Sequence, residues 1–106
     1  MNRPLLLQAR DSLPPRLNAG ILMGDAGFCI LGWMLFCAGY HPITLYANTI
    51  AVVDLTRGGV AIDVVAGPYD LPRAAVVELA RLNDTTAVGQ RTAAVRSRLT
   101  ELLGLG

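Results

Sequence analysis

The polar residues that could bind a ligand in this chain are mainly arginines near its C-terminal end. All nine basic residues are arginine, which excludes Schiff-base chemistry and a phosphate-binding lysine. Arg91, Arg96 and Arg98 fall within one expected helix and could hold phosphate groups. The same pattern is typical of a solvated helix face, and no aromatic residues are interleaved with the arginines for base stacking. We therefore keep nucleic-acid binding through these arginines only as an alternative.

Three further residues complete the candidate binding site. Asn83 and Asp84 follow an expected helix, where they are typical of a helix end but could also form a surface recognition spot. Arg57 is the only basic residue in the central part of the chain. The candidate binding residues are therefore Arg57, Arg91, Arg96, Arg98, Asn83 and Asp84.

The residue types that usually carry catalysis or bind a metal are scarce and poorly spaced. His41 is the only histidine, and neither Ser12 nor Ser97 lies in a nucleophile-elbow pattern. Cys29 and Cys37 would lie about 12 Å apart along a helix, too far for a disulfide, so we expect two free thiols in a reducing compartment. With His41 they match no compact zinc pattern. We expect no enzyme activity, metal or cofactor.

The elements that must position these residues begin with a long apolar stretch. The chain has 106 residues, 53% of them hydrophobic, and a net charge of +1, which predicts a single domain over residues 1–106. Residues 26–53 carry no formal charge, and residues 26–40 read AGFCILGWMLFCAGY. A membrane span needs about 20 apolar residues. The stretch therefore favours a buried central helix at residues 26–39, with a membrane helix at about 21–41 as the alternative.

The rest of the chain predicts a mixed α+β fold. A short helix is expected at residues 4–13, followed later by β-branched strands at 48–55 and 60–66 around a glycine-containing turn. Such a hairpin would bring Asp54 near Asp63, either in solvent or as a carboxylate pair, and its edge could pair with a second copy. Two helices follow. The first is expected at residues 72–82 with Asp70 as its cap, and the second at 90–103 with an apolar stripe of Val88, Val95, Leu99 and Leu102.

Two stretches resemble a group of small proteins encoded by phages and prophages. Residues 27–32 read GFCILG and residues 34–39 read MLFCAG, which is similar to the CCLG…LC…AG helix of that group. The Leu71-Pro72 pair, the LND sequence at residues 82–84 and the final helix resemble the second half of those proteins. This sequence departs from the group at Phe28, where a cysteine is usual, and in the closing helix, which lacks the usual aromatic and acidic residues.

The resemblance implies a soluble, phage-associated accessory protein without a cofactor. Together with the lack of a catalytic constellation, it favours a non-catalytic protein that binds a host or phage protein in the cytoplasm. Inhibition of a host defence or regulatory complex is one such activity. The small membrane protein and the nucleic-acid-binding regulator are the alternatives.

Overall fold

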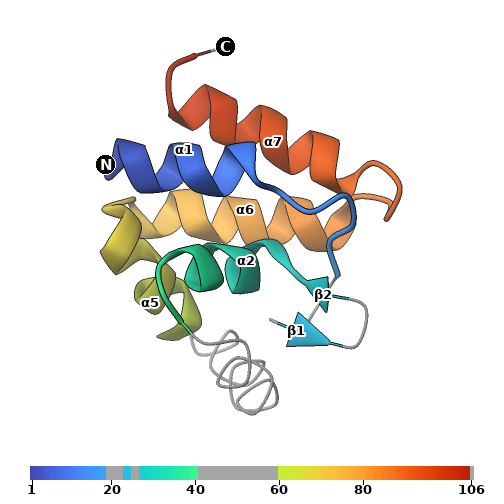
Figure 1. Ribbon diagram of the computed structural model, residues 1–106, viewed down its shortest axis with the longest axis horizontal. Helices are drawn as coiled ribbons and strands as arrows, with labels where there is room; N and C mark the ends of the chain where they lie inside the picture. Colours follow the sequence, from blue (N-terminus) through green and yellow to red (C-terminus); the bar gives the residue numbers. More distant parts are fainter. Residues whose placement is uncertain (19–22, 25–26, 41–59, 106) are drawn as a thin grey trace.

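The structure is a computed structural model that describes residues 1–18, 23–24, 27–40 and 60–105. These residues form five helices and one pair of very short strands (Figure 1). In chain order the elements are α1 (Arg3–Asp11), β1 (Met23–Gly24), β2 (Gly27–Phe28), α2 (Ile30–Cys37), α5 (Val60–Tyr69), α6 (Arg73–Thr85) and α7 (Arg91–Leu102).

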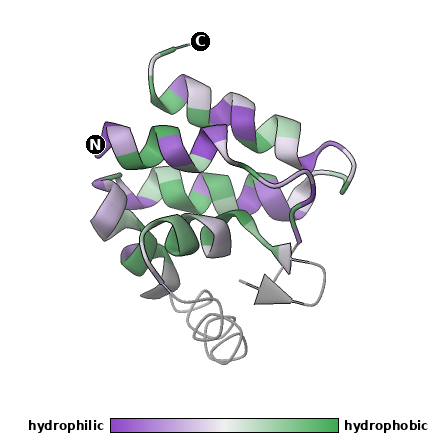
Figure 2. Ribbon diagram, in the orientation of Figure 1, coloured by the Kyte–Doolittle hydropathy of each residue, from purple (hydrophilic) through white to green (hydrophobic). Residues whose placement is uncertain are grey.

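The helices surround one shared apolar core. Helices α2 and α7 each contact both α1 and α6, and α5 contacts α1, α2 and α6 near one end of the bundle. All five helices contribute buried apolar side chains to the same cluster. Figure 2 shows that α2 is hydrophobic along most of its length, whereas α1, α6 and α7 alternate between hydrophobic and hydrophilic residues. The amphipathic helices therefore cover the apolar one.

The two C-terminal helices confirm the prediction from periodicity. On α6, the buried side chains are Val76, Leu79 and Asn83, which lie on one face at helical spacing. On α7, Val95 and Leu99 are buried in the same way. Val88 was expected to extend the stripe of α7, but it lies before the helix begins and is 46% exposed.

The apolar helix is present but shorter than predicted. It begins at Ile30, because residues 23–24 and 27–28 form an antiparallel strand pair instead of a helical turn. Gly39 has a φ of 106°, a left-handed conformation that glycine adopts readily just after a helix. The single helix over residues 21–41 that the membrane alternative requires is therefore not formed. Among the described residues, no helix combines the length and the apolar character needed to cross a bilayer.

The predicted second strand of the hairpin is wrong. Residues 60–66 belong to α5, in which the buried side chains Ile62, Val65 and Tyr69 follow helical spacing, while Asp63 and Val64 are exposed. The β-branched composition favoured a strand, but packing against the core selected the helical periodicity. The first strand, at 48–55, lies outside the described residues, as do Asp54 and Arg57.

This correction changes the fold class and one predicted interface. The described part of the chain is small and mostly helical, and its one strand pair consists of two residues on each side. The α+β description with a hairpin at 48–66 is not confirmed. The predicted homodimer through the edge of that hairpin cannot use residues 60–66 as a strand, because the backbone of those residues is helical.

The turn between α5 and α6 corrects another prediction. Asp70 does not cap α6, because Pro72 occupies the N-cap position and no side chain bonds there. Asp70 instead has a φ of 49° in the turn, and its carboxylate lies 2.8 Å from the Met1 ammonium. The adjacent Tyr69 is fully buried, and its hydroxyl donates a hydrogen bond of 2.6 Å to the carbonyl of Met34 in α2. This bond fixes α5 against the apolar helix.

Candidate functional site

Asn83 is a buried structural residue rather than a surface recognition residue. Its side chain is fully buried, and its Oδ1 accepts a hydrogen bond of 3.0 Å from the amide of Ile30, the first residue of α2. Its Nδ2 donates to the carbonyl of Asn18 at 2.6 Å and to the Asp84 carboxylate at 3.0 Å. The first amides of a helix have no partner within the helix, so a side-chain acceptor there is stabilising. Asn83 thus joins α6, α2 and the segment after α1.

Asp84 and Arg57 do not complete a site with Asn83. Asp84 is exposed, and the hydrogen bond that it accepts from Asn83 fixes the orientation of the buried amide. Arg57 lies outside the described residues. The predicted recognition spot at residues 83–84 is therefore a junction between elements. Of its two residues, only Asp84 contacts solvent.

Arg91 is also engaged inside the fold. Its Nη1 donates a hydrogen bond of 2.7 Å to the carbonyl of Leu17, and its Nε donates one of 3.1 Å to the carbonyl of Thr86. Hydrogen bonds from charged donors are stronger than those between neutral groups. Arg91 therefore holds the segment before β1 against the start of α7, and two of its five guanidinium N–H groups are used within the fold.

The remaining two predicted arginines differ from each other. The guanidinium of Arg98 lies 2.7 Å from Glu101 and 2.8 Å from Glu78, so it links α7 to α6. Its hydrogen bond to Glu101 and its pairing with Glu78 hold the pKa of Arg98 above its usual value. Arg96 is exposed, on the side of α7 that also carries Ser97 and Thr100. Of the three arginines predicted as a cluster, only Arg96 is exposed and makes no ion pair with a described residue.

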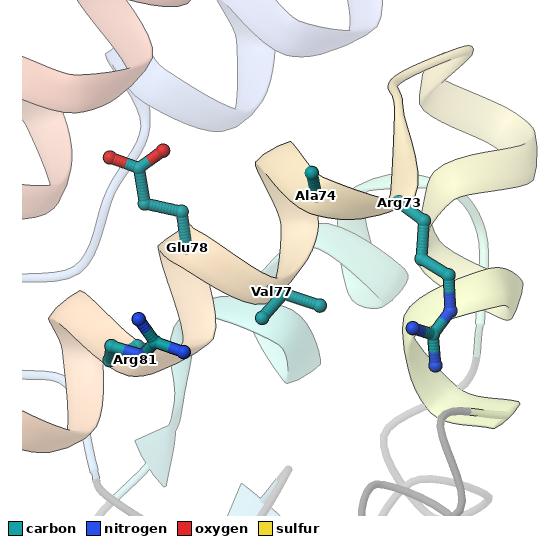
Figure 3. Close-up of a pocket in the computed structure, with 5 residues that line it drawn as sticks. All are labelled: Arg73, Ala74, Val77, Glu78 and Arg81. Atoms are coloured by element: carbon teal, nitrogen blue, oxygen red, sulfur yellow. The ribbon is translucent and has the colours of Figure 1, made fainter.

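A different surface, on α6, combines charge with an apolar centre. We call it the α6 outer face and define it by its lining residues, which are Arg73, Ala74, Val77, Glu78 and Arg81. They border an open hollow of about 710 Å³. In Figure 3, Arg73 and Arg81 lie toward the two ends of the face and Val77 lies between them. The face lies opposite the buried stripe of α6, and among the described residues only these five line its hollow.

The charges on the α6 outer face are not equivalent. Glu78 is paired with Arg98 of α7, so its charge is balanced within the fold. Arg73 pairs with Asp63 of α5 at 3.2 Å, and both side chains are more than half exposed, at 54% and 65%. Among the described residues, no carboxylate lies within ion-pair distance of the exposed Arg81. The face therefore carries excess positive charge.

The sequence contains a signal for the α6 outer face in the spacing of its residues. Arg73, Val77 and Arg81 recur every four residues, which places them on one side of a helix. The cluster Arg91, Arg96 and Arg98 is denser in sequence, but those residues do not share one face. Helical spacing, rather than density in sequence, identifies the arginines that act together.

Aromatic side chains form a second partly exposed group. The rings of Phe28, Trp33 and Phe36 lie 5.3–5.6 Å apart, a spacing typical of favourable aromatic contacts. The Trp33 indole donates a hydrogen bond of 2.9 Å to the carbonyl of Ala9, which joins α2 to α1. Phe36 remains 39% exposed. These residues form part of the rim of the core.

The two cysteines lie at the two ends of the apolar helix α2. Cys29 and Cys37 are free thiols, as predicted. Cys29 is buried at the N-cap of α2, where its sulfur accepts a hydrogen bond from the amide of Gly32, and burial raises its pKa to about 11. A protonated thiol is a poor nucleophile. Within the described part of the chain, no three histidine, cysteine or acidic side chains gather as a metal site would require.

Comparisons with known proteins identify no relative that could assign a role to these residues. No protein-family model, no curated protein and no solved structure matches the chain.

Proposed function

We propose that this chain is a non-catalytic accessory domain that acts by binding another protein through the α6 outer face. The observation that carries the proposal is the arrangement of Arg73, Val77 and Arg81 around an open hollow on one helix. A wide, shallow surface with an apolar centre and charged ends suits a protein contact better than a small molecule, which prefers an enclosed pocket.

The use of the other polar side chains supports this proposal. The polar residues that a catalytic site would recruit, such as Asn83 and Arg91, bond to backbone groups of neighbouring elements. These hydrogen bonds stabilise the fold and hold both side chains in place. The α6 outer face differs because its charged side chains are exposed: Arg73 and Glu78 make ion pairs with α5 and α7, and Arg81 makes none with a described residue.

The resemblance to small phage proteins adds a class of partner to the proposal. Small phage accessory proteins that resemble this chain would act on a protein of the host, and inhibition of a host defence or regulatory complex is the activity that we predict from that resemblance. The nucleic-acid alternative is less well supported, because Arg91 and Arg98 are engaged with carbonyl and carboxylate oxygens.

A photo-crosslinking experiment tests the proposed surface. A photoreactive phenylalanine analogue replaces Val77 in the full chain, and a matched variant carries it at the exposed Ser97 of α7. Both variants are irradiated in extract from cells in which the chain is produced, and far-UV circular dichroism first confirms that both are folded. We expect a discrete protein adduct from position 77 and none from position 97.

Two results would contradict the proposal. If position 77 gives no adduct, or if both positions give the same adducts, the α6 outer face is not the binding surface. If the adduct contains nucleic acid instead of protein, the chain belongs to the nucleic-acid-binding class. Identification of the adduct by mass spectrometry then shows whether the captured protein belongs to the host or to the phage.

A further inference from the structure

We infer that the partner of the α6 outer face presents an acidic segment, with two carboxylates placed to reach Arg73 and Arg81 and an apolar side chain between them. This inference rests on the proposed function and specifies the chemistry of the partner. It follows from three properties of the face, namely its uncompensated charge, the spacing of its arginines and the like charges that two copies would bring together.

The charge on the face is complementary to a carboxylate partner. The guanidinium of Arg81 is exposed, and no described carboxylate lies within ion-pair distance of it. Arg73 has only one pair, with the exposed Asp63. Pairs between exposed side chains contribute little, so Arg73 can exchange Asp63 for a carboxylate of a partner. Planar guanidinium groups bind carboxylates with two parallel hydrogen bonds, which gives the contact directional specificity.

The spacing of the face fixes the pattern that the partner must have. Arg73 and Arg81 are eight residues apart, or about 12 Å along the helix axis. Ala74 and Val77 provide an apolar floor between them. A partner helix lying along α6 would match with acidic residues seven or eight positions apart and a leucine or methionine midway. The apolar floor also argues against a phosphate backbone, which has no apolar group to place there.

A second copy of this chain is a poor occupant of the same face. Val77 is midway between the two arginines, so antiparallel pairing of two α6 helices across Val77 would place Arg73 of one copy opposite Arg81 of the other. Parallel pairing about a twofold axis would place each arginine opposite itself. Both arrangements bring like charges together, which is destabilising. The face therefore selects a different protein.

Fluorescence anisotropy with synthetic peptides tests this inference on the full chain. The probe is a labelled helical peptide with glutamates at positions 4 and 12 and leucine at position 8, and its control has lysines in place of the glutamates. We expect saturable binding of the acidic peptide only. The variants Arg73→Glu and Arg81→Glu each weaken binding at least tenfold, whereas Arg96→Glu, with the same change of net charge, alters it less than twofold. A higher salt concentration should also weaken binding of the acidic peptide to the unmodified chain.

The outcomes separate this inference from the proposed function. If position 77 crosslinks a protein but the acidic peptide does not bind, or binds no better than the lysine peptide, the acidic chemistry is wrong and the binding surface stands. If Arg96→Glu weakens binding as much as Arg81→Glu, the peptide responds only to overall charge and the inference fails. If a DNA duplex displaces the acidic peptide from Arg81, the ligand is a polyanion and the inference also fails. If position 77 captures nothing, both proposals fail.

Discussion

The junction at Asn83 allows the sharpest test of how this fold is held together. Its side chain is fully buried and satisfies two backbone groups, the amide of Ile30 and the carbonyl of Asn18. Asn83→Ala removes both partners. A buried polar group left without a hydrogen bond costs roughly 1–3 kcal/mol. The carbonyl of the half-buried Asn18 can recover part of this loss from water, so we expect a total destabilisation of about 2–4 kcal/mol.

This loss is large for a domain of 106 residues. Small domains are stable by about 5–15 kcal/mol, so Asn83→Ala should lower the Tm by on the order of 10–20 °C. Urea denaturation followed by the fluorescence of Trp33, the only tryptophan, measures the free energy of unfolding. The control is Asp84→Ala at the exposed neighbouring position, which we expect to cost less than about 1 kcal/mol.

A second variant separates the two hydrogen bonds. Asn83→Asp keeps an acceptor for the Ile30 amide but loses the donor to Asn18, and it buries a carboxyl group beside Asp84. Burial and the neighbouring carboxylate raise the pKa of the new carboxyl group in the folded state. The variant should therefore gain stability relative to wild type as the pH falls. The structural reasoning is refuted if Asn83→Ala unfolds within about 0.5 kcal/mol of wild type.

The remaining predictions concern other buried polar contacts and the thiols. Tyr69→Phe removes the hydrogen bond to Met34, so we expect a loss of about 1 kcal/mol in urea denaturation, and an unchanged midpoint would contradict the contact. Arg91→Ala should lower the free energy of unfolding by about 1–3 kcal/mol, because two carbonyls lose their donor. Arg96→Ala on the exposed side of α7 should lower it by less than about 0.5 kcal/mol. Equal losses in the two variants would contradict the different roles of these arginines. Burial raises the pKa of Cys29 from 9.0 to about 11, so the unfolded state releases its proton first as the pH rises. Stability is then complete below pH 9 and falls by about 2–3 kcal/mol by pH 11, and Cys29→Ala should remove this part of the alkaline loss.

The sequence predicted the helices whose apolar stripe is regular, but the predicted end of α6 at residue 82 is wrong, because the helix continues through Asn83 and Asp84 to Thr85. The helix containing Val76, Leu79 and Asn83 could be located because polar and charged residues occupy its other side. The start of α2 could not be located, because an unbroken apolar run has no periodicity and does not show where the short strands end. In α5, the β-branched composition indicated a strand and the spacing of the apolar residues indicated a helix. Packing of these residues against the core stabilises the helix.

The candidate site was harder to predict than the fold. Asn83 and Arg91 are polar residues at element ends, and the sequence cannot show whether such a side chain faces water or a backbone group of a distant element. Asn83 reaches the amide of Ile30, 53 positions away, and Arg91 reaches the carbonyl of Leu17, 74 positions away. The spacing of Arg73, Val77 and Arg81 was readable from the sequence. Its importance depends on burial of the opposite side of α6, which only the structure shows.

The most direct test of the central claim is to map where an acidic helical peptide binds to the chain. Two-dimensional ¹⁵N–¹H NMR spectra recorded during a peptide titration report the environment of each backbone amide. If the account is right, the largest shifts lie along residues 73–81 of α6 and disappear in the Arg81→Glu variant. Shifts centred on Arg91–Leu102 of α7, or no saturable shifts in α6, would contradict the assignment of the α6 outer face as the binding surface.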